Sequence, residues 1–221
     1  MKPRHEAMNR LNHPAAVRLG VMILGAGRSS RMGRPKLLLP WGETSVVGHL
    51  LAVWRRLGAR QVTVVLAAGD GLLSGELDRL GVAAEDRVVN HAPDRGMFSS
   101  IQCGAGWDGW QAGLSHWAIV LGDQPHLRLG TLRRLLRLAG ANPESVCQPA
   151  SAGRPRHPVL LPRGVFRALA VSQAPHLESF LAGRACASYA STDPGLTLDL
   201  DRPGDYQAAR NLSTPARWRR G

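Results

Sequence analysis

The sequence predicts one α/β domain with a mainly parallel sheet and helices on both faces. Three apolar runs rich in Val, Ile and Leu predict buried strands, at Val21–Leu24, Gln61–Ala67 and Trp117–Gly122. Continuous apolar runs of this kind are typical of strands covered on both faces. Segments with helical spacing separate them, and alternating strands and helices favour a parallel sheet. A length of 221 residues with 44% hydrophobic residues suits one domain with some embellishment.

In the N-terminal half, Val21–Leu24 opens the sheet, and a loop rich in Gly, Ser and Arg follows it. Thr44 or Ser45 is the expected cap of a helix that runs to Leu57 and stops at Gly58, and Ser99 or Ser100 is expected to open a later one. The remaining elements expected here are a strand at Gln61–Ala67, a helix at Leu72–Leu80 and a short strand at Val88–Val89.

In the C-terminal half, Trp117–Gly122 is followed by an amphipathic helix at Leu129–Leu138 with its arginines outward. Further strands are expected at Ser145–Gln148, Pro158–Leu161 and Leu196–Leu200, and helices at Gly164–Ala170, at His176–Leu181 and from Pro203 onward. By composition, residues 1–18 form a loose tail, 19–212 the domain and 213–221 a basic C-terminal tail.

Composition excludes several classes of protein. The formal charge is +12, from 28 Lys and Arg against 16 Asp and Glu, but the basic residues are scattered and aromatics are 5% of the chain. Nucleic-acid binding is therefore not the expected role, whereas a nucleotide substrate suits the charge. No apolar run approaches the ~20 residues of a membrane span, so no membrane partner is expected. Three widely spaced cysteines and no secretory signal predict a cytoplasmic protein without disulfides.

The loop after the first strand has the composition of an anion-binding loop. Ligands bind beyond the carboxyl ends of strands in an open parallel sheet, and this loop begins Gly25-Ala26-Gly27. Glycine backbone N–H groups and basic side chains suit a triphosphate. The spacing matches neither GxxxxGK[ST] nor GxGxxG. Lys36 ends the loop in a chain whose other basic residues, Lys2 apart, are all arginines, which indicates a specific use for its point charge.

Carboxylates follow two later strands of the prediction. Asp123 follows the third long strand, and Asp199 and Asp201 lie at the end of the expected strand Leu196–Leu200. Strand alternation would put the last two on one face. A lone Asp after a strand is commonly a turn former or helix cap, but three carboxylates favour a Mg²⁺ site shared by Asp123 and one of the pair.

Five motifs in order resemble those of the MobA-like nucleotidyltransferase superfamily, and most of all the molybdenum cofactor cytidylyltransferases. Leu24–Lys36 resembles L-A-A-G-x-S-x-R-M-G-x-x-K, Gly96–Ile101 resembles G-M-S-x-S-[IL], and Leu121–Pro125 matches L-G-D-x-P. Gly153–Val159 is similar to G-x-x-[GR]-H-P-V, and Asp199–Tyr206 resembles D-I-D-T-P-E-D-[LY]. Gly25 departs from the second residue of L-A-A-G, Phe98 stands where a small residue is usual, and Arg202 replaces a threonine. The resemblance spans about Val21 to Ala209.

The resemblance implies a Rossmann-like domain in which an acceptor phosphate attacks the α-phosphorus of a nucleoside triphosphate and releases pyrophosphate. It implies CTP as the favoured nucleotide, since Ala26 stands where guanylyltransferase relatives have Gly, a molybdopterin-type acceptor, and Mg²⁺. Lys36, Arg31 and Asp123 would be catalytic, His157 and Pro158 would lie near the acceptor, and Asp123, Asp199 and Asp201 would hold the metal. The nucleotide-binding residues would be Leu24, Gly25, Ala26, Gly27, Arg28, Ser29, Lys36, Gly96, Ser99 and Ser100.

Two other functions stay open on the sequence. One is a nucleotidyltransferase for a different acceptor, such as a sugar or alcohol phosphate. The other is a non-catalytic, chaperone-like module that hands a nucleotide-containing cofactor to a molybdenum hydroxylase. Lys36 and the carboxylates disfavour the second function, because a carrier needs no Mg²⁺ site.

Overall fold

The computed structural model describes residues 17–27 and 32–213. Its main sheet has the order β10-β7-β9-β6-β1-β4-β5, with β8 paired to β7 at one end. The strands are β1 (Leu19–Leu24), β4 (Gln61–Ala67), β5 (Arg87–Asn90), β6 (His116–Leu121), β7 (Val146–Ser151), β8 (Arg154–Pro155), β9 (Val159–Pro162) and β10 (Cys186–Ala190). β1 is parallel to β4 and β6, β4 to β5 and β7 to β10, whereas β9 is antiparallel to both of its neighbours. The prediction of a mainly parallel sheet is confirmed.

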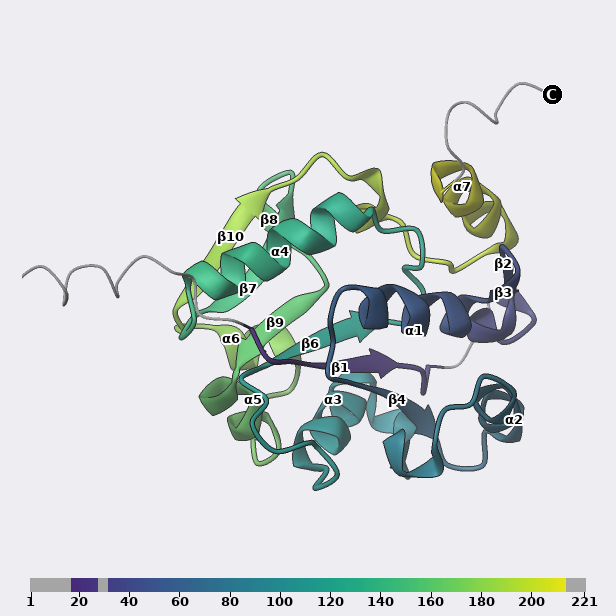
Figure 1. The fold of residues 1–221 in the computed structure, drawn as a ribbon, viewed down its shortest axis with the longest axis horizontal. Coiled ribbons are helices and arrows are strands. Elements are labelled where there is room, and N and C mark those ends of the chain that lie inside the picture. The colour runs from purple at the N-terminus through teal and green to yellow at the C-terminus, as the bar shows by residue number, and fades with distance from the viewer. Residues whose placement is uncertain (1–16, 28–31, 214–221) are drawn as a thin grey trace, which may run out of the picture.

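Helices cover both faces of this sheet, as predicted. Figure 1 shows α1 and α4 on one face and α3, α5 and α6 on the other, while α7 lies beside the short ribbon of β2 and β3. The helices are α1 (Val46–Arg56), α2 (Gly71–Arg79), α3 (Met97–Gly106), α4 (Leu129–Ala141), α5 (Arg163–Leu169), α6 (Leu177–Leu181) and α7 (Pro203–Ser213); the ribbon is β2 (Pro40–Trp41) and β3 (Thr44–Ser45).

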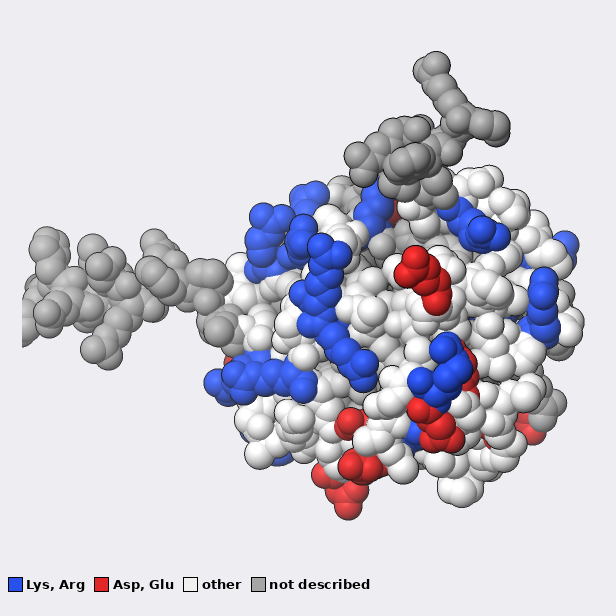
Figure 2. Space-filling model, turned by 45° about the vertical axis from the view of Figure 1, so that its right-hand side comes forward, with Lys and Arg blue, Asp and Glu red and all other residues white. Residues whose placement is uncertain are grey.

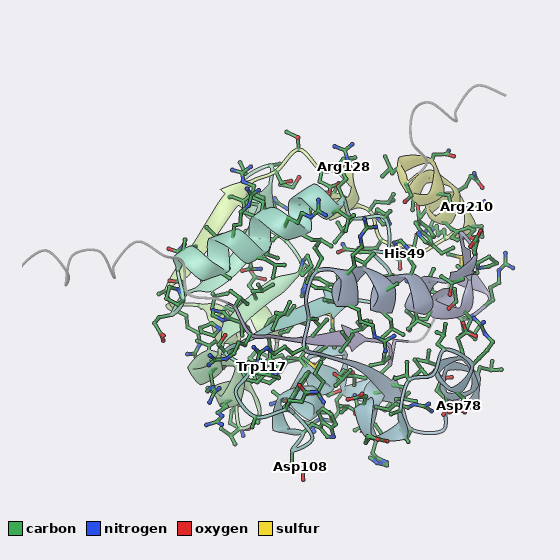
Figure 3. The ribbon with its side chains drawn as sticks, in the orientation of Figure 1. His49, Asp78, Asp108, Trp117, Arg128 and Arg210 are labelled. Carbon is green, nitrogen blue, oxygen red and sulfur yellow. The ribbon has the colours of Figure 1, made fainter. Side chains whose placement is uncertain are left out.

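The sheet separates two apolar cores. Along β1, Val21 and Ile23 pack with α1 and α4, whereas Met22 packs with α3 and α5. This is the period of two that a strand imposes on its side chains. In the second core the rings of Trp117 on β6 and Phe166 on α5 stack with centroids 4.5 Å apart and 3° between planes. Figure 3 shows Trp117 where the sheet meets the helices of that face.

Two predictions about the elements are wrong. The segment Leu196–Leu200 is not a strand, because Pro194–Thr197 forms a 3-10 turn and the next residues are irregular. Leu196 and Leu200 are buried, which explains the misleading pattern. The last strand is instead β10, an edge strand of which only Tyr189 is fully buried, so it carries no apolar run. α3 also begins two residues before Ser99, after Gly96 with φ of 89°.

The topology brings two loops together at the carboxyl edge of the sheet. β1 lies between β4 and β6, and the arrows of all three point to the same side in Figure 1. Leu24 at the end of β1 pairs with Leu121 at the end of β6. A Cβ at Gly122 would stand 2.6 Å from the Leu24 carbonyl oxygen. Only glycine therefore lets the two chains approach so closely where ligands bind in such sheets.

The surface of the described residues is rich in arginine. Figure 2 shows Lys and Arg over much of the visible face, with Asp and Glu mainly in its lower half. α4 alone presents three exposed arginines, Arg133, Arg134 and Arg137. Within the described part of the chain, no helix has the length and apolar character needed to cross a membrane.

Candidate active site

A cleft of ≈ 430 Å³ lies at the carboxyl ends of β1 and β6. Its floor is apolar, made largely by leucines, and its polar groups come from four segments of the chain. The lining residues are Leu24, Gly25, Ala26, Gly27, Pro35, Lys36, Leu37, Leu38, Asp70, Leu73, Pro93, Asp94, Gly96, Met97, Ser100, Leu121, Gly122 and Asp123. Lys36 is the one basic residue of this described lining, against three aspartates.

The glycine loop forms one wall of the cleft, and its first glycine is required by packing. The Gly25 N–H donates to the Val65 carbonyl at 2.7 Å. A Cβ at Gly25 would lie 2.9 Å from Leu37 and 3.0 Å from the Val65 oxygen, which gives a reason for glycine where relatives have alanine. A Cβ at Gly27 would point into space that no described residue fills. The predicted residues Arg28, Ser29 and Arg31 lie outside the described residues.

Lys36 connects the glycine loop to two carboxylates. It opens the 3-10 turn Lys36–Leu38, and its Nζ lies 2.6 Å from Asp201 Oδ1 and 3.2 Å from Asp123 Oδ2. Its side chain is 16% exposed. Burial alone lowers the pKa of Lys36, but hydrogen bonds and charge from Asp201 and Asp123 outweigh it and leave the pKa above its ordinary value. The ammonium group therefore stays charged at neutral pH.

Asp123 lies two residues beyond the end of β6, where its surroundings disfavour the charged form of its carboxyl group. Its burial, and then the negative charge of Asp199, raise the pKa of this carboxyl group, while Lys36 opposes the rise. Three carboxylates do surround the carboxyl edge of β6. In the part of the chain that the structure describes, however, no three acidic, His or Cys side chains are arranged as a ready metal site.

Asp199 and Asp201 lie on irregular backbone, so the expectation that strand alternation positions their side chains is wrong. Asp201 contacts Lys36, whereas Asp199 Oδ1 accepts a hydrogen bond of 2.9 Å from Gln124 Nε2. The Leu200 N–H donates to the Asp123 carbonyl at 3.2 Å and fixes this segment against the end of β6. The structure therefore joins Asp201, and not Asp199, directly to the Lys36–Asp123 pair.

Asp193, which sequence reasoning missed, holds this segment in place. Its buried carboxylate accepts hydrogen bonds from the Arg128 N–H at 2.9 Å, the Thr131 hydroxyl at 2.7 Å and the Gly195 N–H at 3.0 Å. It thus caps α4, whose own Arg128 supplies no side-chain cap. Figure 3 labels Arg128 at the start of that helix. An Asp before Pro-Gly signals a turn, but the sequence does not say which helix it caps.

The loop before α3 contributes unequally to the cleft. Gly96 and Ser100 line it, but Ser99 does not. The Asn90 side-chain amide donates to both serine hydroxyls at 2.9 Å, and the Ser99 hydroxyl donates to the Gly96 carbonyl at 2.8 Å. Asn90 is buried. Ser99 and Asn90 therefore fix the shape of the loop, while Gly96 and Ser100 face the cleft.

His157 and Pro158 lie outside the cleft lining, before β9. His157 is half-buried, and its Nδ1 lies 3.5 Å from the Ile119 carbonyl oxygen. Burial lowers the pKa of His157, while the Ile119 carbonyl and the charge of Asp199 act to raise it. The charge of Asp199 therefore reaches His157, which lies on the side of β6 away from the glycine loop.

A glycine-walled cleft with a lysine and carboxylates at the carboxyl edge of a mainly parallel sheet is typical of a nucleotide-binding domain. A family model described as a MobA-like NTP transferase domain matches residues 21–189. This chain therefore belongs to the MobA-like nucleotidyltransferase family, as the five motifs predicted.

Individual relatives agree with this assignment. The molybdenum cofactor cytidylyltransferase of Escherichia coli is 23% identical over 87% of this chain and 96% of its own length. The bifunctional protein GlmU of Clavibacter sepedonicus is 31% identical, over 56% of this chain and 25% of its own. The crystal structure of Rv0371c from Mycobacterium tuberculosis is 28% identical, with a TM-score of 0.68 over 89% of this chain and 99% of its own. A manganese complex of the same protein is 27% identical, with a TM-score of 0.65 over 88% and 99%.

Proposed function

We propose that this protein is a Mg²⁺-dependent cytidylyltransferase that transfers CMP from CTP to the phosphate of a molybdopterin cofactor and releases pyrophosphate. The observation that carries the proposal is the convergence of Lys36, Asp123 and Asp201 beside the glycine loop. A cation and two carboxylates beside a glycine loop are what phosphoryl transfer needs, because its catalysis consists mainly of positioning and electrostatic stabilisation.

The chain's own residues have distinct roles in the proposed reaction. The backbone of the glycine loop beyond Gly25, with Arg28 and Arg31, holds the triphosphate, and Lys36 stabilises negative charge on the α-phosphate. The acceptor phosphate attacks the α-phosphorus, the bond to the bridging oxygen breaks, and its electron pair leaves with pyrophosphate. No general base is needed, because the acceptor phosphate is already an anionic nucleophile. Gly96 and Ser100 face the nucleoside, and His157 lies toward the acceptor.

The donor set fits Mg²⁺. Asp123 and Asp201 each bring a carboxylate oxygen to the same cation, at present the Lys36 ammonium group. Mg²⁺ binds through one or two carboxylates together with substrate phosphates and waters, so three protein ligands need not be in place beforehand. When bound, Mg²⁺ neutralises phosphate charge during transfer. The manganese complex of the Mycobacterium tuberculosis relative supports a divalent ion in this family.

The acceptor and the base rest on the comparison with the Escherichia coli enzyme. That cytidylyltransferase aligns with this chain over nearly its whole length, whereas GlmU aligns with little more than half of it. A relative whose full length matches supports a shared acceptor site as well as a shared nucleotide site. We therefore favour molybdopterin over a sugar phosphate, and a molybdenum hydroxylase as the enzyme that receives the product.

The test offers each of the four common nucleoside triphosphates with Mg²⁺ and purified molybdopterin cofactor. Pyrophosphate release and the mass of the dinucleotide product are measured. We expect CTP to give both, and Asp123→Asn to give little of either. Asp108→Asn is the matched control, because Asp108 is exposed, does not line the cleft and lies at the lower edge of the molecule in Figure 3. Release of pyrophosphate only with a different acceptor or nucleotide would overturn the assignment.

A further inference from the structure

The Lys36 ammonium group lies where two carboxylates need a cation. Its Nζ contacts one oxygen of Asp123 and one of Asp201, and Asp199 adds further negative charge near Asp123. These side chains are largely shielded from water, with exposures of 16% for Lys36, 26% for Asp123 and 29% for Asp201. Like charges held together in such surroundings repel strongly unless a counter-charge separates them.

The same side chain also lines the cleft beside the glycine loop. Lysine has a flexible stem with a compact charged end, so a short rotation of the side chain can carry the ammonium group from the carboxylates toward a phosphate. A guanidinium group, with its planar fork, would be fixed more firmly to the two carboxylates. This difference explains why a chain that otherwise uses arginine keeps a lysine at this position.

We infer that Lys36 is the resident counter-cation of the Asp123–Asp201 pair and that a divalent metal ion competes with it for the same oxygens. The inference rests on the proposed metal site. Metal binding releases the ammonium group to the cleft, where it meets the triphosphate. The arrangement couples the two cations: Lys36 becomes available to the nucleotide when the metal is in place, and the carboxylates have a cation beside them at every stage.

If Lys36 competes with the metal, removing its charge should raise the affinity for metal. If Lys36 only supported the site, removing it should lower that affinity. Removing the charge of Lys36 should strengthen metal binding to the nucleotide-free protein. Mn²⁺ is the probe, measured by the paramagnetic resonance signal of free Mn²⁺ and by calorimetry at fixed ionic strength. We expect Lys36→Met to bind Mn²⁺ about tenfold more tightly than the wild type, since a unit charge in contact with the ligands is gone. Lys36→Arg, which keeps the charge, should bind Mn²⁺ no more tightly than the wild type.

Arg34→Met is the matched control, because Arg34 is an exposed cation two residues away, and its loss should leave Mn²⁺ affinity unchanged. Lys36→Gln is the second neutral variant if Lys36→Met folds poorly. Thermal unfolding gives a separate readout: without metal both neutral variants should melt below the wild type, and Mn²⁺ should raise their Tm by more than it raises that of the wild type.

Equal or weaker Mn²⁺ binding in both neutral variants would overturn the inference, and so would a tenfold gain in Arg34→Met. These measurements use neither nucleotide nor acceptor. A protein inactive with CTP and molybdopterin whose neutral variants still bind Mn²⁺ tightly would contradict the proposed function alone. An active enzyme without the gain in affinity would contradict this inference alone.

Discussion

At the scale of single residues, the site depends on side chains that are distant in the sequence. Lys36 is 87 residues from Asp123 and 165 from Asp201, yet one Nζ atom contacts both. Asp199 and Asp201 are chemically the same and two positions apart, but one meets an amide and the other an ammonium group. The contact made by each carboxylate, and not its residue type, therefore assigns its role.

Substitutions of Asp201 and Asp199 should have different effects in a Mg²⁺ titration of pyrophosphate release. Asp201→Asn should behave like Asp123→Asn, with a higher Mg²⁺ concentration at half-maximal rate and a lower maximum, because both contact the position of the cation. Asp199→Asn should change the Mg²⁺ requirement and the maximal rate less, because Asp199 Oδ1 already accepts a hydrogen bond from Gln124. A larger Mg²⁺ requirement in Asp199→Asn than in Asp201→Asn would contradict the pairing seen in the structure.

Lys36→Ala should lower turnover far more than it lowers stability with Mg²⁺ present. Loss of one electrostatic contact in the transition state typically costs ~10²–10³-fold in rate. The free energy of unfolding should change by about 0.5 kcal/mol or less when the metal balances the carboxylates. Steady-state kinetics and urea unfolding on the same preparation measure the two effects. Wild-type turnover in this variant would remove Lys36 from the mechanism.

At the scale of elements, the glycines at the ends of β1 and β6 have two different functions. Gly122 permits a close crossing, because a Cβ there would meet the Leu24 carbonyl at 2.6 Å and Leu37 at 2.8 Å. A Cβ at Gly27 would meet no atom of the described residues within 4 Å, its chain neighbours apart, so packing does not require glycine there. Gly122, like Gly25, is therefore needed for the fold, whereas Gly27 leaves backbone that can face a ligand.

Substituting alanine at these two positions should separate stability from binding. Gly122→Ala should lower the free energy of unfolding by about 1–3 kcal/mol, the usual cost of overpacking. Gly27→Ala should leave stability within about 0.5 kcal/mol and raise KM for the nucleoside triphosphate, because Gly27 lines the cleft. Urea unfolding and initial-rate kinetics decide the matter. Equal stability losses in both variants would show that the loop after β1 is more closely packed than described.

At the scale of the whole molecule, buried histidines link stability to pH. His116 and His126 are each 4% exposed, and burial lowers the pKa of both below the ordinary 6.5, although nearby carbonyl and carboxylate groups act to raise it. Below about pH 6.5 the unfolded chain binds more protons than the folded one. Stability from these neutral histidines is thus complete above that pH and declines as the pH falls.

The melting temperature should therefore fall between about pH 7.5 and about pH 5, and His116→Asn should reduce the slope of that fall. Asp123 acts in the opposite direction, because its raised pKa favours the folded state on acidification, so the comparison of variants is more informative than the total. His91→Asn is the control, since His91 is exposed and its loss should leave the slope unchanged. An unaltered slope in His116→Asn would contradict the prediction.

The sequence by itself determined the fold class, the order of the central strands and helices, the family, and the candidate residues Lys36 and Asp123. Those features come from local patterns: apolar runs make buried strands, and motif residues directly follow them. Only the tertiary structure decided that Asp201, and not Asp199, contacts Lys36, and that Ser99 supports the loop without lining the cleft. It also decided that Asp193 anchors the last segment and that β10, and not Leu196–Leu200, is the final strand. There are two physical reasons. An edge strand exposes its side chains, so its sequence has no apolar run that would predict it. The path of an irregular segment is set by hydrogen bonds to distant residues, such as those of Asp193 and of the Asp123 carbonyl, and no spacing in the sequence predicts these bonds.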